Sequence, residues 1–209
     1  MKKIQSSLCV VGIALAFCSC NQHPDPVATQ EIKDVLEEIE NLDNVTLDDL
    51  SIKTVGDQYS ISIPEDLTVT TSLNDAASLQ YNNIYSEKYI IVIDEDKQSF
   101  IDILKSLDAF GSSKELIDEY ADIQISSFGE NLTISNQSKV IKTNINGMDA
   151  RLFAFDATIE GVAEPISYWT GYYVGKDNLY TIMAWTLKSL KNDYEKEANL
   201  ILKSLKESY

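Results

Sequence analysis

The sequence is poor in the side chains that carry most hydrolytic and metal chemistry. Its 209 residues include one histidine and three cysteines, and the histidine, His23, lies in the polar stretch NQHPDP near the N-terminus. Ser-His-Asp, Cys-His and histidine-containing zinc sites need a histidine held rigidly by its neighbours, which such a stretch does not supply. Nucleotide chemistry has no support either, because neither GxGxxG nor GxxxxGKS/T occurs. We expect no cofactor.

Basic residues are scarce as well. Seventeen lysine and arginine residues stand against 33 acidic ones, for a net charge of −16 at pH 7. A surface of this sign repels nucleic-acid phosphates and anionic lipid headgroups. We therefore expect no nucleic-acid partner, and membrane attachment must come from something other than a basic patch.

The N-terminus has the pattern of a secretory signal peptide. Lys2 and Lys3 precede the apolar run LCVVGIALAF, residues 8–17. As a helix this run would rise about 15 Å, roughly half the thickness of a bilayer's hydrocarbon core. The pattern predicts a signal peptide over residues 1–19 and not a permanent membrane span.

The end of that run resembles the lipobox of bacterial lipoproteins. Ser19 places a small side chain before Cys20, whereas the rival Cys18 follows the bulky Phe17. The resemblance implies that Cys20 is lipidated and becomes the N-terminus, and that the membrane is its first partner. An ordinary secretory signal is the alternative. With Cys9 and Cys18 removed, the mature chain would hold no disulfide or thiolate site.

The residues after Cys20 bear on location. The sequence SCN with a polar, proline-containing continuation is similar to Bacteroidetes-type lipoproteins. Asn21 stands where an aspartate retains enterobacterial lipoproteins at the inner membrane, which favours the outer membrane. Asp25 alone is a weak surface-export signal, so we favour the periplasmic face over the cell surface.

Residues 20–57 read as a tether, and residues 58–209 as one domain. NQHPDPVA is a polar spacer. Within the tether, Ile32, Val35, Leu36 and Ile39 have helical spacing and predict a short helix, and loop follows to residue 57.

The domain alternates strands and helices in an order typical of α+β proteins. Strands are predicted at 58–64, 78–85 and 88–93, then helices at 97–110 and after the Ser112/Glu115 capping pattern. A hairpin turns at Asn146-Gly147, two further strands are divided by residues 175–178, and a helix spans about 187–206. We expect an antiparallel sheet covered by helices on both faces.

At this level the domain resembles the PsbP-like α/β/α sandwich family. The resemblance rests on YSISIP, SLQYNN with KYIIVIDE, NGMDARLFAFDA, SYWTGYYV, LYTIMAWT and the ending ANLILKSLKES, over about residues 58–207. It implies a binding or assembly module. No position matches a functional motif of the family, so no site residue is carried over.

Two groups of charged residues are candidate sites. Asp94, Glu95 and Asp96 end a predicted strand and offer the oxygen ligands that calcium prefers. The residues of an EF-hand loop are missing, so we favour a solvated strand end. Arg151, the one arginine, suits a carboxylate or phosphate ligand. A surface or cross-strand ion pair is the alternative that we favour.

The sharpest binding candidate is the segment YWTGYY. On a strand, Trp169 and Tyr173 share one face, while Tyr168 and Tyr172 share the other. An exposed aromatic pair beside a glycine would stack on a sugar ring. The alternative, which we favour, is that both pairs pack beneath helices.

The leading hypothesis is a cell-envelope lipoprotein that binds or scaffolds another envelope component, with an envelope protein as the expected partner, without catalysis. One alternative is a glycan-binding accessory protein that uses the YWTGYY strand. The second is a carboxylate- or calcium-dependent hydrolase, which needs two carboxyl groups facing across a cleft.

Overall fold

The computed structural model describes residues 50–107, 115–128 and 132–208. They belong to one compact unit, Leu47–Tyr209. The predicted signal peptide, Cys20, the helix of the tether and Ser112 lie outside the described residues.

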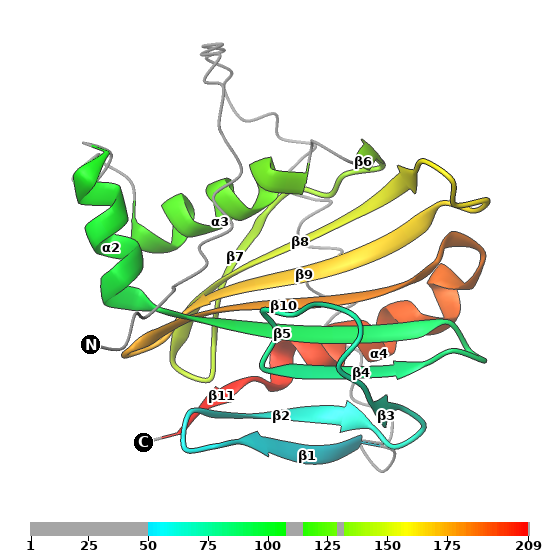
Figure 1. Cartoon of the computed structure of the whole chain (residues 1–209), viewed down its shortest axis with the longest axis horizontal. Coiled ribbons are helices and arrows are strands. Elements are labelled where there is room, and N and C mark those ends of the chain that lie inside the picture. The colour runs from blue at the N-terminus through cyan, green and yellow to red at the C-terminus, as the bar shows by residue number, and fades with distance from the viewer. Residues whose placement is uncertain (1–49, 108–114, 129–131, 209) are drawn as a thin grey trace, which may run out of the picture. The chain divides into compact units, whose positions relative to one another are not determined.

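An eight-stranded sheet forms the centre of the domain (Figure 1). Its order is β3-β4-β5-β10-β9-β8-β6, with β7 paired to β8 beside β6, and every pairing is antiparallel. The strands are β3 (Thr68–Val69), β4 (Leu79–Asn83), β5 (Lys88–Asp96), β6 (Leu132–Ser135), β7 (Ile141–Ile145), β8 (Met148–Ile159), β9 (Ile166–Val174) and β10 (Asn178–Leu187).

A second sheet of three strands has the order β1-β2-β11. It consists of β1 (Leu50–Val55), β2 (Tyr59–Pro64) and β11 (Lys206–Glu207). The prediction of loop up to residue 57, with the domain starting at 58, is wrong for β1. In β1, which pairs with β2, alternate side chains are half-buried. The strand was not predicted because its apolar residues, Leu50, Ile52 and Val55, do not keep the strict two-residue period by which a strand is recognised.

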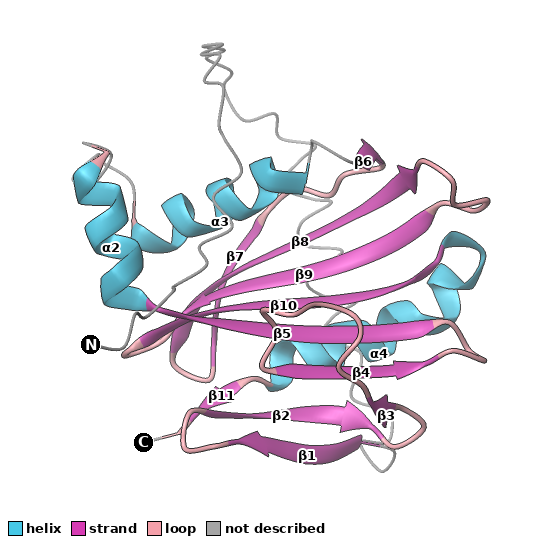
Figure 2. Cartoon of the chain, viewed as in Figure 1, coloured by secondary structure: helices cyan, strands magenta, loops and turns pink. Residues whose placement is uncertain are grey.

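Helices cover both faces of the large sheet (Figure 2). On one face, α2 (Lys97–Ser106) packs on β5 and β10, and α3 (Leu116–Ser127) on β8 and β9. On the other, the 3-10 helix η4 (Lys188–Leu190) leads into α4 (Lys191–Ser204), which contacts β2, β9 and β10. The predicted α+β fold class is confirmed. The last helix begins later than predicted because β10 continues to Leu187.

Each face has its own apolar core. The α4-side core includes side chains of β2, so the small sheet closes this side of the domain together with α4. The α3-side core is richer in phenylalanine. Because β9 and β10 are inner strands with both faces covered, most of their side chains are buried, which is the burial that apolar runs predict.

The hairpin between β7 and β8 turns where the sequence predicts it. Asn146 and Gly147 have φ angles of 51° and 88°, the positive values that a two-residue primed turn requires. The Asn146 side chain also donates a hydrogen bond of 2.7 Å to the carbonyl of Leu205, so the turn holds the end of α4. Of the helices in the described ranges, none is both long and apolar enough to cross a membrane.

Candidate functional site

The aromatic side chains of the YWTGYY segment are buried in β9. Trp169 and Tyr173 are 2% and 0% exposed on the α4 side, and Tyr168 and Tyr172 are 8% and 0% exposed on the α3 side. The Tyr173 hydroxyl donates to the carbonyl of Leu202 in α4 at 2.5 Å. Both aromatic pairs therefore pack beneath helices, which is the alternative that we favoured. The hypothesis of a glycan-binding platform on this strand is wrong, because rings without exposed faces cannot stack on a sugar.

A row of aromatic rings crosses four strands on the α3 side. Tyr89, Trp185, Tyr168 and Phe155 are directly opposite one another on β5, β10, β9 and β8. Their rings stack with centroids 5.4, 6.1 and 4.9 Å apart. Trp185 is partly exposed, but a neighbouring ring lies against each of its faces, so it too offers no free face to a sugar.

The three carboxylates at the end of β5 do not converge. Asp96 accepts a hydrogen bond of 2.6 Å from the backbone N–H of Ser99 and caps α2. Glu95 accepts one of 2.6 Å from the Tyr120 hydroxyl, whereas Asp94 points to the other face of the strand. Within the described ranges, no group of three or more acidic, histidine or cysteine side chains is arranged to hold a metal ion. Glu95 and Asp96 therefore both have partners within the domain, and Glu95 is not the freely solvated group that the sequence favoured.

Arg151 forms a buried ion pair between β8 and α3. It is 4% exposed, and its Nε donates to Asp118 at 2.6 Å while Nη2 donates to Glu115 at 2.9 Å. The hydrogen bond from Arg151, with a further one from Lys142, lowers the pKa of Asp118 to about 2. The guanidinium is therefore engaged in an ion pair, but it is buried and its partners lie at the start of α3, so the expectation of a surface or cross-strand pair is wrong.

A second buried carboxylate, Asp156, was not singled out from the sequence. It is 1% exposed and accepts hydrogen bonds from Ser167 and Asn136 at 2.7 Å and contacts from Lys188 and Lys191 at 3.0 and 3.2 Å. Burial alone would raise the pKa of Asp156, but these four donors hold it well below its usual range. The cluster fastens β8 and β9 to the start of α4.

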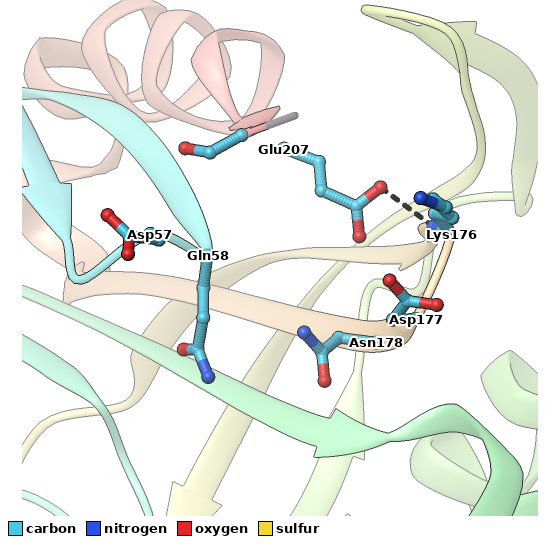
Figure 3. A pocket seen from close by; sticks show the side chains of 7 residues that line it. Asp57, Gln58, Lys176, Asp177, Asn178 and Glu207 are labelled. Atoms are coloured by element: carbon cyan, nitrogen blue, oxygen red, sulfur yellow. Dashed lines mark hydrogen bonds between the residues drawn. The ribbon is translucent and has the colours of Figure 1, made fainter.

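A polar pocket of about 300 Å³ opens at one end of the domain (Figure 3). Three segments far apart in the sequence meet there: the turn between β1 and β2, the turn between β9 and β10, and the C-terminal strand β11. The lining residues are Asp57, Gln58, Lys176, Asp177, Asn178, Glu207 and Ser208. No pattern in the sequence predicts this pocket, because β11 is only two residues long and carries no strand pattern.

Glu207 is the buried member of the pocket, with 6% of its surface exposed. Its carboxylate accepts hydrogen bonds from the backbone N–H of Lys176 at 2.7 Å and from the Tyr180 hydroxyl at 3.1 Å. A side chain on Gly175 would place its Cβ 2.8 Å from the Glu207 carboxyl carbon, so only glycine lets the two segments approach this closely. The pocket also brings three carboxylates to one cavity, and a polar cavity of this size suits a small ligand.

Comparisons with known proteins place the fold. No family model matches the sequence, and no curated protein matches it. Among solved structures, the cyanobacterial PsbP protein CyanoP from Synechocystis sp. PCC 6803 is similar, with a TM-score of 0.51 and 10% identity. The match covers 78% of this chain and 94% of that one. The fold is PsbP-like.

Other solved structures are more distant. The protein of unknown function PA94 from Pseudomonas aeruginosa covers 72% of this chain and 91% of its own, with 12% identity and a TM-score of 0.41. LpqN, described as involved in cell envelope biogenesis of Mycobacterium tuberculosis, covers 72% and 83%, with 11% identity and a TM-score of 0.40. At these values neither contributes to the argument. At 10% identity, the similarity to CyanoP shows the PsbP-like fold and nothing about function.

Proposed function

We propose that this protein is a lipid-anchored protein of the cell envelope whose PsbP-like domain binds another envelope protein without catalysing a reaction. The proposed anchor is Cys20, preceded by a signal peptide and followed by a tether. Two or more acyl chains would attach so acidic a protein stably to a membrane, where a basic patch is not available. We place it at the outer membrane with the domain facing the periplasm.

One observation carries the non-catalytic part of the proposal. Three carboxylates that could serve as acids or bases are bound to other groups of the domain: Asp118 to Arg151, Glu95 to Tyr120, and Asp156 to four donors. A general acid or base must reach the substrate proton within hydrogen-bonding distance. Groups that join sheet to helix in this way stabilise the fold and leave recognition to the surface.

Crosslinking in intact membranes tests the proposal. A tagged wild-type protein is crosslinked in the native host, solubilised and purified, beside a Cys20→Ser variant and a matched Cys18→Ser variant. We expect one reproducible envelope protein with wild type and Cys18→Ser, and its loss with Cys20→Ser because the domain leaves the membrane. Recovery of the same partner with all three would contradict the role of the anchor. A membrane-bound protein that yields no specific partner would contradict the binding role.

A further inference from the structure

Glu207 is a buried carboxylate without a cationic partner. Its two hydrogen-bond donors, a backbone N–H and the Tyr180 hydroxyl, are both neutral. Among the ion pairs of residues 50–107, 115–128 and 132–208, none includes Glu207. By contrast, Asp156, which is also buried, has two lysines beside it. Burying an ionised carboxylate is strongly unfavourable unless a positive charge or several donors compensate it.

The pocket in front of Glu207 is electronegative. Asp57 and Asp177 add two carboxylates to its lining, against the single ammonium of Lys176. The remaining lining side chains, Gln58, Asn178 and Ser208, carry neutral oxygen acceptors (Figure 3). Carboxylates that share a cavity with few cations raise the local concentration of positively charged ligands.

The pocket is held in place before any ligand arrives. The backbone N–H of Ser208 donates to the carbonyl of Gln58 at 2.8 Å, which joins the C-terminus to the first turn. Lys97 donates two hydrogen bonds to the turn between β9 and β10. Its backbone N–H donates to the Asp177 carbonyl at 3.0 Å, and its Nζ donates to the Gly175 carbonyl at 2.9 Å. A site that is already ordered loses little conformational entropy on binding.

We propose that this pocket binds a primary ammonium group, such as a lysine side chain presented by a partner protein. An ammonium ion donates three hydrogen bonds in different directions, and the pocket offers acceptors from three separate segments. A guanidinium instead favours a single carboxylate that it binds in a planar, two-pronged geometry. A metal ion is a poorer candidate, because the described residues contain no cluster of three or more acidic, histidine or cysteine side chains arranged to hold one. A cavity of about 300 Å³ has room for one such side chain.

This inference rests on the chemistry of the pocket and not on where the protein lies in the cell. Its failure would leave the membrane attachment and the crosslinking result above unaffected. Equally, loss of the anchor by Cys20→Ser would not alter binding of a small amine in solution.

The experiment is an NMR titration of the ¹⁵N-labelled mature protein in detergent micelles. The probe is Nα-acetyl-lysine methylamide, and the matched neutral probe is Nα-acetyl-norleucine methylamide. We expect saturable shifts of the Lys176, Asn178 and Ser208 amides with the lysine probe only. Since a hydrogen bond to a charged group is worth a factor of about ten or more, Glu207→Gln should weaken binding at least about tenfold.

Two variants serve as controls. Glu195→Gln removes an exposed carboxylate of α4 outside the pocket and should leave the affinity unchanged. If Glu207→Gln does not fold, as its spectrum would show, Asp177→Asn removes an exposed charge of the same pocket and should weaken binding by a smaller factor. Equal shifts with both probes, no saturable shift at millimolar concentrations, equal affinity in the pocket variants, or tighter binding of calcium ions at the same amides would each overturn the assignment.

Discussion

Replacing Asp118 by asparagine should destabilise the domain by about 2 kcal/mol at pH 7. Hydrogen bonds and charge from Arg151 lower the pKa of Asp118 from 3.8 to about 2. One pKa unit corresponds to about 1.4 kcal/mol, so the ionised carboxylate stabilises the folded state by about 2 kcal/mol. The Asp118 side chain is 20% exposed, so solvent screening is limited. Glu115 remains beside the guanidinium, which keeps the loss below the 3–5 kcal/mol typical of a buried charge left alone.

The pH dependence has a definite sign. The folded-state pKa of Asp118 lies below its unfolded value, so its contribution is present above about pH 4 and is lost as the pH falls toward about 2. The wild-type protein should therefore lose more stability than Asp118→Asn over this interval. At the acid end the two proteins should become nearly equal in stability. Groups such as Asp156 titrate in both proteins and therefore do not contribute to the difference between them.

Urea unfolding followed by tryptophan fluorescence measures both effects. Trp169 is 2% exposed and will report unfolding by its change of environment. The control is Lys142→Gln, which removes the partner of Asp118 that is 64% exposed and should change stability by less than about 1 kcal/mol. A difference below about 0.5 kcal/mol at pH 7, or parallel pH profiles of wild type and Asp118→Asn, would refute the ion-pair argument. Combining Asp118→Asn with Arg151→Met should restore part of the loss, because no buried charge then remains unpaired.

Three further predictions concern single positions. Gly171→Ala should destabilise the domain by about 1–3 kcal/mol in the same urea assay, because the new Cβ would lie 2.7 Å from the Leu202 side chain, and normal stability would show that α4 shifts easily. Asp96→Ala should lower the free energy of unfolding by about 1 kcal/mol, because it removes the N-cap of α2. Calcium should leave the thermal midpoints of the wild type and this variant unchanged, and a calcium-dependent midpoint in the wild type alone would support a metal site. Metabolic labelling with a fatty-acid analogue should be abolished by Cys20→Ser and retained by Cys18→Ser, and label surviving in the Cys20→Ser protein would contradict the lipidation prediction.

The strands with a simple local pattern could be predicted from the sequence. Alternation in YSISIP, the apolar run before Asp94 and the Asn146-Gly147 turn are properties of neighbouring residues, and the corresponding strands lie where expected. The short strands β3, β6 and β11 were missed. Two to four residues carry too little periodicity, and these segments become strands because the edge of an existing sheet accepts them.

Side-chain roles that depend on register could not be predicted. The row of rings from Tyr89 to Phe155 forms because the pairing register of four strands places these residues opposite one another. The register between two strands cannot be read from the sequence of either strand alone. The partners of Asp156 likewise come from β9, from the loop after β6, from the 3-10 helix before α4 and from the first residue of α4. The face shared by Trp169 and Tyr173 was predicted correctly, because alternation along one strand is local.

The covered sheet also limits where such a domain can recognise a partner. Helices and the small sheet close both faces, so aromatic side chains on β9 and β10 stabilise the core whatever their binding potential. What remains at the surface are the outer faces of the helices together with strand ends, turns and edges, and binding residues often lie in such turns. The pocket around Glu207 lies at such a place, where two turns and the C-terminal strand meet. A recognition site in this PsbP-like domain is therefore expected to be built from residues far apart in the sequence and to leave no contiguous motif.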